Sequence, residues 1–133
     1  MPEYRLPIRV YIEDTDAGGI VYYVNYLKYF ERARTELIRS LGVDKTAVME
    51  DGSVFVVTSA SIDYHAPARL DDQLESVAEV VSIGAATIEF RQSVVRSGVE
   101  LATGQVMVAL TDGSSGKPKR MPKGLRELLT LSA

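Results

Sequence analysis

The sequence contains no cysteine, and its 133 residues include one histidine, His65. The absence of cysteine excludes disulfide bonds, a thiolate nucleophile and a cysteine-ligated metal, so the fold depends on the packing of apolar side chains. With one histidine, a metal site would have to be built from carboxylates, and no loop has the ligand spacing of a calcium site. The sequence therefore predicts no bound metal.

The sequence also lacks an excess of positive charge and any long apolar run. Its 15 basic and 18 acidic residues give a net charge of -3, which argues against a broad basic face for nucleic acid. No stretch reaches the roughly 18 consecutive apolar residues of a membrane span, and the N-terminus, MPEYRLPIRV, does not resemble a signal peptide. We therefore predict a soluble, cytoplasmic protein that binds no nucleic acid and has no membrane span.

The sequence does contain enough apolar surface to build one core. Hydrophobic residues make up 46% of the 133 residues, and a chain of this length fits one domain. It shows no internal repeat and no interdomain linker. Residues 1–133 are therefore expected to form a single domain.

The stretch from Tyr11 to Gly42 is the one around which the chain is organised. It begins with an acidic cluster of Glu13, Asp14 and Asp16, passes through the glycine pair Gly18 and Gly19, and continues with apolar residues at helical spacing. These apolar residues are Tyr22, Tyr26, Phe30, Ala33, Leu37 and Leu41. The pattern predicts a helix from about Tyr22 to Leu41 with Gly42 as its C-cap. The acidic cluster then lies beside the free N–H groups and the positive dipole end of that helix.

Alternating and β-branched residues predict five strands to accompany this helix. They cover Arg5–Glu13, Val54–His65, Leu74–Ile83, Thr87–Arg96 and Val99–Thr111. Short turns separate the last three, which we therefore expect to be antiparallel neighbours. Asp44–Gly52 is either a short helix or a loop, and Pro122 is expected to open a short terminal helix.

The expected lengths of these elements suggest how they assemble. Ten residues of strand span about 33 Å, close to the length of about 30 Å expected for the long helix. One sheet can therefore wrap one helix. Such a sheet still has an exposed face and edges to protect, so we expect at least a dimer.

Two motifs resemble a known family. The motif E-D-T-D-A-G-G-I-V-Y-Y-x-N-Y-L-K-Y-F-E-R-A-R-T-E at Glu13–Glu36 is similar to the hotdog-fold acyl-CoA thioesterases, specifically the 4-hydroxybenzoyl-CoA thioesterase group and, within it, the Tol-Pal-associated acyl-CoA thioesterases. The motif Y-x-A-P-A-R-L-D-D at Tyr64–Asp72 is typical of the same group. This resemblance implies an α+β hotdog fold, an antiparallel sheet of about five strands wrapped around one long central helix. It also implies active sites at the subunit interface of a homodimer or homotetramer.

The resemblance further implies which residues act on the thioester. The position of Asp16 is that of the catalytic carboxylate, either a base toward water or a nucleophile that forms an anhydride. The backbone N–H of Tyr23 is at the position that binds the thioester carbonyl. Gly19 and Asn25 of the same motif are predicted to contact the substrate or to orient the turn. The alternative for Asp16 is that it only caps the helix or completes the turn.

One departure from the family pattern concerns the side chain at Tyr23. Tol-Pal-associated relatives commonly have histidine there, whereas the hydroxybenzoyl type can have tyrosine. A mechanism that pairs histidine with Asp16 is therefore not available at this position. The backbone N–H is independent of the side chain, so the carboxylate mechanism is retained.

Several charged residues have two interpretations. Lys117 and Arg120, in a basic loop, and Arg69, in the second motif, are candidates to bind the phosphates of coenzyme A. Solvated loop charge is the alternative. For the helix, we expect Glu31 and Arg34 to form a partly buried ion pair.

Two other polar residues are expected to be structural. His65 is interpreted as a packing residue at the end of a strand, because no serine nucleophile motif accompanies it. Asp14 is interpreted as a turn-forming residue.

The predicted function is hydrolysis of the thioester bond of acyl-CoA, with a short aliphatic or an aromatic acyl group. The substrate is acyl-CoA or an acyl-carrier-protein thioester, and no cofactor is needed, because the coenzyme A moiety is part of the substrate. An acyl-CoA hydratase of the same fold would place histidine five residues after the aspartate, where this sequence has Val21. The alternative from another class is a noncatalytic acyl-carrier or lipid-associated binding module.

Overall fold

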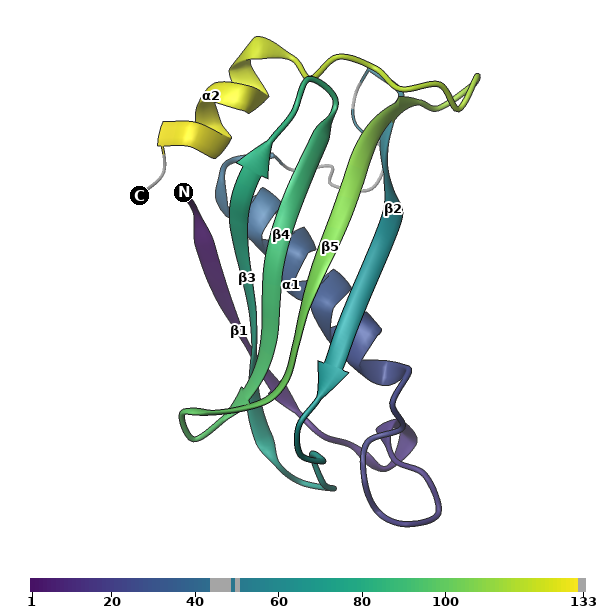
Figure 1. The fold of residues 1–133 in the computed structure, drawn as a ribbon, viewed down its shortest axis with the longest axis vertical. Coiled ribbons are helices and arrows are strands. Elements are labelled where there is room, and N and C mark those ends of the chain that lie inside the picture. The colour runs from purple at the N-terminus through teal and green to yellow at the C-terminus, as the bar shows by residue number, and fades with distance from the viewer. Residues whose placement is uncertain (44–48, 50, 132–133) are drawn as a thin grey trace.

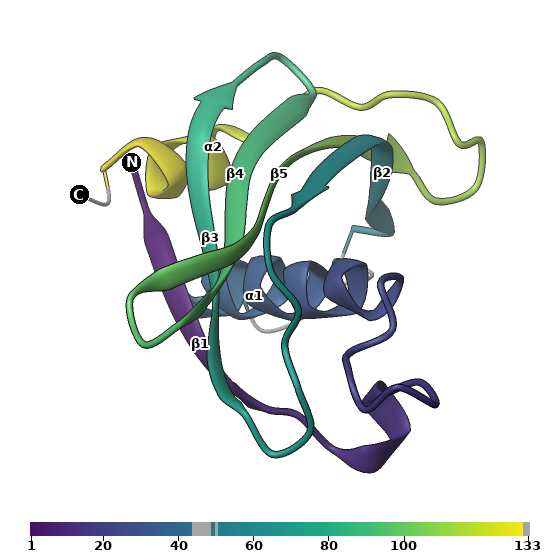
Figure 2. The ribbon, with the colours of Figure 1, turned by 60° about the horizontal axis from the view of Figure 1, so that its bottom comes forward.

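A curved five-stranded antiparallel sheet wraps around one long helix, as Figures 1 and 2 show. The structure, a computed structural model, describes residues 1–43, 49 and 51–131. The helices are α1 (Asn25–Ser40) and α2 (Lys123–Leu131), and a short 3₁₀ turn, η1, covers Ile12–Asp14. The strands are β1 (Glu3–Arg9), β2 (Ser53–Tyr64), β3 (Gln73–Ile83), β4 (Thr87–Arg96) and β5 (Val99–Asp112), and their order in the sheet is β1-β3-β4-β5-β2. The predicted α+β fold is confirmed.

Most of the predicted elements are found where the sequence placed them. The prediction for β4 is correct at both ends, and those for β2, β3 and β5 are correct to within one residue at each end. The strands β3, β4 and β5 are antiparallel neighbours, as expected. The terminal helix α2 begins directly after Pro122. Residues 44–48 and 50 of the predicted short helix or loop lie outside the described residues.

The prediction for β1 is wrong at its C-terminal end. The strand ends at Arg9 rather than at Glu13, and Ile12 is 76% exposed. The cause is a local hydrogen bond, because the Asp14 carboxylate accepts the Tyr11 N–H at 2.9 Å. This side chain offers the backbone an alternative to the sheet, and the chain turns into η1 although the alternation of apolar residues continues.

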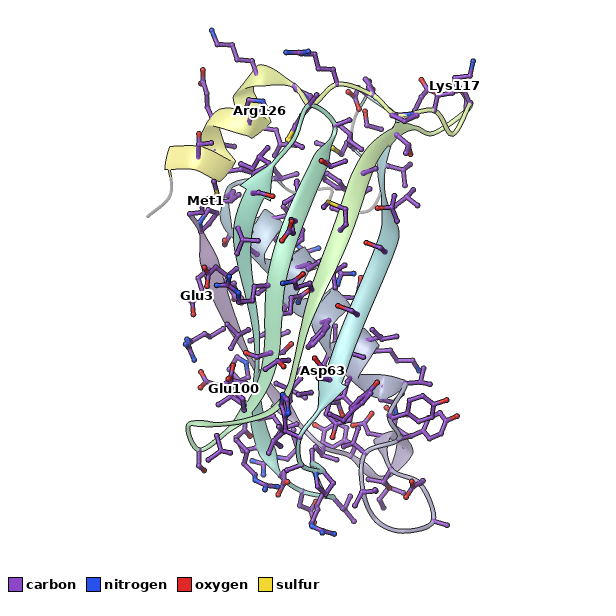
Figure 3. The ribbon with its side chains drawn as sticks, in the orientation of Figure 1. Met1, Glu3, Asp63, Glu100, Lys117 and Arg126 are labelled. Carbon is purple, nitrogen blue, oxygen red and sulfur yellow. The ribbon has the colours of Figure 1, made fainter. Side chains whose placement is uncertain are left out.

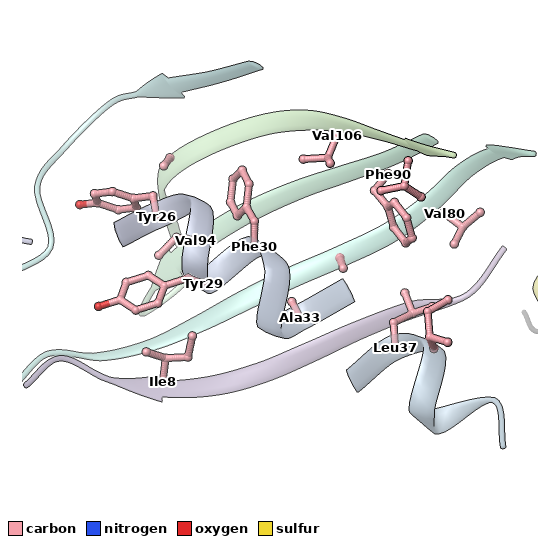
Figure 4. Close-up of a cluster of buried hydrophobic side chains, with 14 of the residues drawn as sticks. Ile8, Tyr26, Tyr29, Phe30, Ala33, Leu37, Val80, Phe90, Val94 and Val106 are labelled. Atoms are coloured by element: carbon pink, nitrogen blue, oxygen red, sulfur yellow. The ribbon is translucent and has the colours of Figure 1, made fainter. Parts of the chain in front are cut away.

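The buried face of α1 forms the centre of the core. Figure 4 shows Tyr26, Tyr29, Phe30, Ala33 and Leu37 of α1 beside apolar side chains of the sheet. Four of these five belong to the apolar stripe predicted from the sequence.

The predicted helix is wrong at its start. It begins at Asn25 instead of Tyr22, which is 46% exposed. The Tyr22 N–H donates to the Asp14 carbonyl at 3.0 Å, so this residue belongs to the preceding loop. Leu41, the last member of the predicted stripe, directly follows α1 and is only partly buried.

Gly104 on β5 lets the sheet approach α1 closely. A Cβ atom at this position would lie 2.9 Å from Cε2 of Phe30 and would also meet the backbone oxygen of Ser61. We expect Gly104→Ala to lower the free energy of unfolding by about 2 kcal/mol, because overpacking a filled core typically costs this much. Urea denaturation measures the change.

The matched control is Gly124→Ala in α2, where an added Cβ meets no atom within 4 Å. This change should leave stability equal or slightly higher, because alanine is the better helix former. Equal stability of the two variants would contradict the close approach at Gly104.

None of the described helices is long and apolar enough to cross a membrane. Within the described residues, no three histidine, aspartate or glutamate side chains gather closely enough to hold a metal ion.

Candidate active site

The loop before α1 folds into a small hairpin that carries Asp16. Thr15 and Val21 form an isolated antiparallel bridge, and the Asp16 N–H donates to the Ile20 carbonyl at 2.9 Å. Gly19 has a φ of 76°, a left-handed conformation that glycine adopts without strain. The chain therefore reverses at this glycine pair. Asp16 lies on the first arm of the hairpin, and the second arm continues into α1.

The Asp16 carboxylate lies at the turn of this hairpin and is exposed in the single chain. Its Oδ1 accepts the Gly18 N–H at 2.8 Å. Through this contact Asp16 completes the turn, which is the alternative role that its sequence position suggested. Oδ2 has no hydrogen-bond partner among the described residues, so one carboxylate oxygen can act on a ligand while the other holds the turn.

Asp14 has the turn-forming role that the sequence predicted. Its carboxylate accepts the Tyr11 N–H, and its carbonyl accepts the Asn25 side-chain amide at 2.8 Å. Burial, followed by the nearby Asp14 charge, raises the pKa of the Tyr29 hydroxyl, which lies beneath this turn. The hydroxyl therefore stays protonated. Asn25 is 9% exposed, and its described contact holds the hairpin to the start of α1.

The second motif packs against the hairpin. Ile20 and Arg69 form an isolated bridge, and the Leu70 N–H donates to the Gly19 carbonyl at 3.2 Å. The two predicted substrate contacts Gly19 and Arg69 thus lie in the same part of the molecule as Asp16. Figure 2 shows this loop region at the N-terminal end of α1.

Asp72 fixes the backbone of the second motif. It accepts the Arg69 N–H at 2.8 Å and pairs with Arg96 at 2.6 Å. Burial by itself would raise the pKa of Asp72, but these hydrogen bonds and the Arg96 charge outweigh it and lower the pKa. The folded state therefore favours the ionised carboxylate.

This direction of shift predicts a pH dependence of stability. Because the pKa is lower in the folded state, the contribution of Asp72 is fully present above its unfolded pKa of about 3.9 and is lost as pH falls through the folded pKa. At pH 6, Asp72→Asn should unfold about 1 kcal/mol more easily than the parent chain. Urea titrations should show that this difference in the free energy of unfolding between variant and parent disappears between pH 6 and pH 2. An equal difference at both pH values would contradict the assignment. The control is Asp63→Asn at an exposed carboxylate, which should unfold as easily as the parent.

A cavity of about 330 Å³ lies beside the start of α1. Ile20, Val21, Tyr23, Tyr26, Tyr64, His65, Ala66 and Pro67 line it. The Tyr23 N–H donates to no carbonyl or side chain among the described residues, and Tyr23 lies in the turn that directly precedes the N-cap of α1, Val24. The hairpin therefore brings a carboxylate and a free backbone donor to one end of the molecule, next to a mostly apolar hollow.

The sequence did not single out Tyr64 as part of this site. Its hydroxyl donates to the Tyr23 carbonyl at 3.0 Å. The only signal for it was its place at the head of the second motif. His65, predicted to be a packing residue, is exposed in the single chain, and its Nε2 lies 2.8 Å from the Thr103 hydroxyl.

The basic loop is not near Asp16 within one chain. Figure 3 shows Lys117 at the end of the molecule opposite to Asp63, which lies near the end of β2 that leads to Tyr64. Arg120 follows in the same loop. Lys119 between them forms an ion pair with Asp51 at 2.9 Å. One chain therefore brings Gly19, Asn25 and Arg69 to the hairpin but leaves Lys117 and Arg120 far from it.

The predicted ion pair between Glu31 and Arg34 is wrong. Arg34 donates to the Gln92 side-chain oxygen at 2.9 Å, and Glu31 accepts the Thr35 hydroxyl at 3.1 Å. Burial lowers the pKa of the Arg34 guanidinium. The long side chain reaches the sheet, and the spacing within the helix could not show this partner.

Arg34 lies at the wall of a second cavity, of about 390 Å³, between the middle of α1 and the sheet. Its other lining residues are Glu31, Thr35, Ile38, Val54, Phe55, Val57, Ile88, Phe90 and Val108. The wall that the sheet forms is apolar.

A sheet wrapped around one long helix is the architecture of the hotdog fold, which the resemblance to hotdog-fold thioesterases implied. A profile of the thioesterase-like superfamily matches residues 10–129. The chain belongs to this family. The predicted class of thioester hydrolases is thereby confirmed.

Individual relatives agree with this assignment. The chain is 41% identical over 123 residues to an acyl-CoA thioester hydrolase, YbgC, of Escherichia coli O6:H1, and the match covers 92% of both chains. It is 43% identical over 124 residues to the acyl-CoA thioesterase YbgC of Haemophilus influenzae, covering 92% of this chain and 91% of that one. The crystal structure of a "probable thioesterase" from Bartonella henselae superposes with a TM-score of 0.85 at 31% identity, covering 90% of this chain and 99% of that one.

Proposed function

We propose that the chain is an acyl-CoA thioesterase in which Asp16 is the catalytic carboxylate and the Tyr23 N–H binds the thioester carbonyl. The observation that carries this proposal is the free Tyr23 N–H beside the 330 Å³ cavity, on the hairpin arm that pairs with the arm of Asp16. Relatives that match nearly the whole chain are named as acyl-CoA thioesterases. Free-thiol release from a panel of acyl-CoA and aroyl-CoA thioesters tests it. No release from any thioester would leave a noncatalytic binding module as the function.

The chemistry requires stabilisation of negative charge on the thioester oxygen. As the carbonyl becomes tetrahedral, its oxygen gains charge, which a backbone donor at a helix N-terminus can stabilise. The Asp16 carboxylate then either removes a proton from an attacking water or attacks the carbonyl carbon itself. In both cases the C–S bond breaks as the tetrahedral intermediate collapses, and coenzyme A leaves as a thiolate that then takes up a proton. No metal or redox group takes part in these steps.

A single turnover in ¹⁸O-labelled water separates the two roles of Asp16. If the carboxylate attacks, the anhydride is hydrolysed and the label can enter the Asp16 side chain, which mass spectrometry of the corresponding peptide detects. If the carboxylate is a base, the label enters only the acid product. Label in the Asp16 side chain therefore identifies the nucleophilic role, since only the anhydride path can join the water oxygen to that carbon.

We also propose that two copies of the chain pair along β2. This strand is an edge of the sheet, has 12 residues, and carries Val56 and Val57 at 44% and 47% exposure. An exposed edge of this length pairs readily with another strand. A second copy would pair with the backbone N–H and C=O groups on this edge, in an antiparallel ladder across a two-fold axis.

Such a pairing would bring the two ends of the molecule together. In an antiparallel ladder, the Ser53 end of one β2 lies beside the Tyr64 end of its partner. The basic loop is held near the Ser53 end, because Lys119 pairs with Asp51 and the Asp112 N–H donates to the Lys117 carbonyl. Lys117 and Arg120 of one protomer would then reach the hairpin of the other, where they could bind the phosphates of coenzyme A. Arg69 already lies beside the hairpin within its own chain.

The proposed reaction needs no cofactor besides the substrate. Acyl-CoA and an acyl-carrier-protein thioester share the reacting group, and the thiol-release panel compares them directly. A cytoplasmic location remains a prediction of the cysteine-free sequence. The link to the Tol-Pal system likewise remains a prediction of the family resemblance.

A further inference from the structure

We propose that Tyr64 is a positioning residue that holds the carbonyl-binding backbone at the start of α1. The Tyr64 hydroxyl donates a hydrogen bond of 3.0 Å to the carbonyl of Tyr23, whose N–H is the proposed donor to the thioester. The two residues are 41 positions apart in the sequence and lie on different elements. This inference rests on the proposed function, because it assigns Tyr64 a role in the same site.

The Tyr23 carbonyl is only weakly held by the residues at the start of α1. Val24 occupies the N-cap position and makes no side-chain hydrogen bond, since valine has no acceptor to offer. The Tyr26 N–H donates to the Tyr23 carbonyl in the turn that precedes α1, and this hydrogen bond is long at 3.4 Å. Helix ends held in this way fray readily. The Tyr64 hydroxyl supplies the shorter contact to the same carbonyl.

Tyr64 is itself anchored by the sheet. It is the last residue of β2 and pairs with Ala102 of β5, and the next residue, His65, donates its N–H to the Leu101 carbonyl at 2.8 Å. The Tyr64 ring packs edge-on against Tyr23 at 6.2 Å and against Tyr26 at 5.3 Å between ring centroids. The side chain thus connects the rigid sheet to the start of the helix.

The environment keeps Tyr64 a hydrogen-bond donor. Burial, followed by the neighbouring hydroxyls of Tyr23 and Tyr26, raises the pKa of the Tyr64 hydroxyl above its usual value of about 10. The group therefore stays protonated through neutral and mildly alkaline pH. A phenylalanine at this position would keep the ring contacts and lose only this donor.

An oxyanion donor must be held in place before the reaction to be effective. Preorganised donors contribute most because they need no reorganisation as charge develops, and small displacements of such groups cost large factors in rate. Removing the Tyr64 hydroxyl leaves the Tyr23 N–H in the site but orients it less well toward the thioester oxygen. The effect should therefore fall on kcat more than on KM.

The experiment compares Tyr64→Phe with the parent and with Tyr4→Phe, a control on β1 far from this site. We expect Tyr64→Phe to lower kcat by roughly tenfold to thirtyfold, a smaller loss than removal of a whole donor causes. KM and Tm should stay close to the parent values. Tyr4→Phe should leave kcat unchanged.

A spectroscopic readout separates positioning from a purely structural role. In the Asp16→Asn background, a bound acyl-CoA persists, and infrared difference spectroscopy reports the stretching frequency of its thioester carbonyl. A strong donor lowers this frequency, so adding Tyr64→Phe should shift the band back toward that of free acyl-CoA. A fall in kcat together with a large loss of Tm and an unchanged band would overturn the inference, as would unchanged kcat.

Failure of the proposed function would look different. If the parent releases no thiol, or if Asp16→Asn retains full turnover, the assigned chemistry is wrong. Tyr64 then positions no donor to a thioester carbonyl. If the parent is active, Asp16→Asn is inactive and Tyr64→Phe matches the parent, only the role of Tyr64 is rejected. Tyr64→Leu provides a second variant, which should lose at least as much kcat as Tyr64→Phe.

Discussion

Replacing Asp16 with asparagine is expected to lower kcat for acyl-CoA hydrolysis by a factor of at least about 1,000, because groups that act as base or nucleophile contribute on this scale. The fold should survive. Asparagine retains the oxygen that accepts the Gly18 N–H at 2.8 Å, so the hairpin turn can form as before. It loses the negative charge needed to activate water or to attack the carbonyl. Steady-state thiol release and thermal unfolding measure the two expectations.

The matched control for this change is Glu13→Gln. Glu13 is an exposed carboxylate in the same acidic cluster, three residues before Asp16, and removing its charge alters the local potential without touching the proposed chemistry. Turnover should remain within about twofold of the parent, since exposed charges are strongly screened. If Glu13→Gln lost as much activity as Asp16→Asn, the general field of the cluster, and not one carboxylate, would be responsible.

Placing lysines on the edge strand is expected to separate the protomers and reduce activity. The double variant Ser59→Lys, Ser61→Lys adds like charges to both β2 strands near the proposed two-fold axis, where they face each other across the ladder. We expect the dimer dissociation constant to rise by roughly a hundredfold. At concentrations where the parent is dimeric and the variant monomeric, turnover should fall by a similar factor. Sedimentation velocity and thiol release at matched concentrations measure both.

This loss is expected because, in the proposed dimer, each site takes residues from both chains. Asp16 is exposed in the single chain, and Lys117 lies at the opposite end of the molecule from the hairpin. The control is Gln105→Lys, which places an exposed lysine on β5 beside Ser61 but not on the sheet edge. This variant should remain dimeric and active. A monomeric double variant with full activity would contradict the shared site.

The regular elements were predictable because their patterns are local. The strands β3, β4 and β5 are separated by short turns that contain Gly84 or Gly98, and their predicted bounds were correct to within one residue. The long helix was visible in the spacing from Tyr26 to Leu37. The true start of this helix was not visible in the sequence. Tyr22 fits the helical spacing, but its N–H donates to the Asp14 carbonyl in the hairpin.

The contacts that the sequence did not predict join residues far apart in the sequence. Arg34 and Gln92 are 58 positions apart, and Tyr64 and Tyr23 are 41 apart. Helical spacing suggested Glu31 as the partner of Arg34, because it shows neighbours on one helix and cannot show a glutamine on the sheet. Asp16 and Tyr23 were found through the family motif, and their roles stay predictions until they are measured.

The most direct measurement is a crystal structure of Asp16→Asn with a bound, slowly hydrolysed acyl-CoA. The account predicts the thioester oxygen at about 2.7–3.1 Å from the Tyr23 nitrogen and the side chain of residue 16 within about 3.5 Å of the carbonyl carbon. An acyl-CoA bound with its thioester away from the start of α1, and with residue 16 facing solvent, would contradict it.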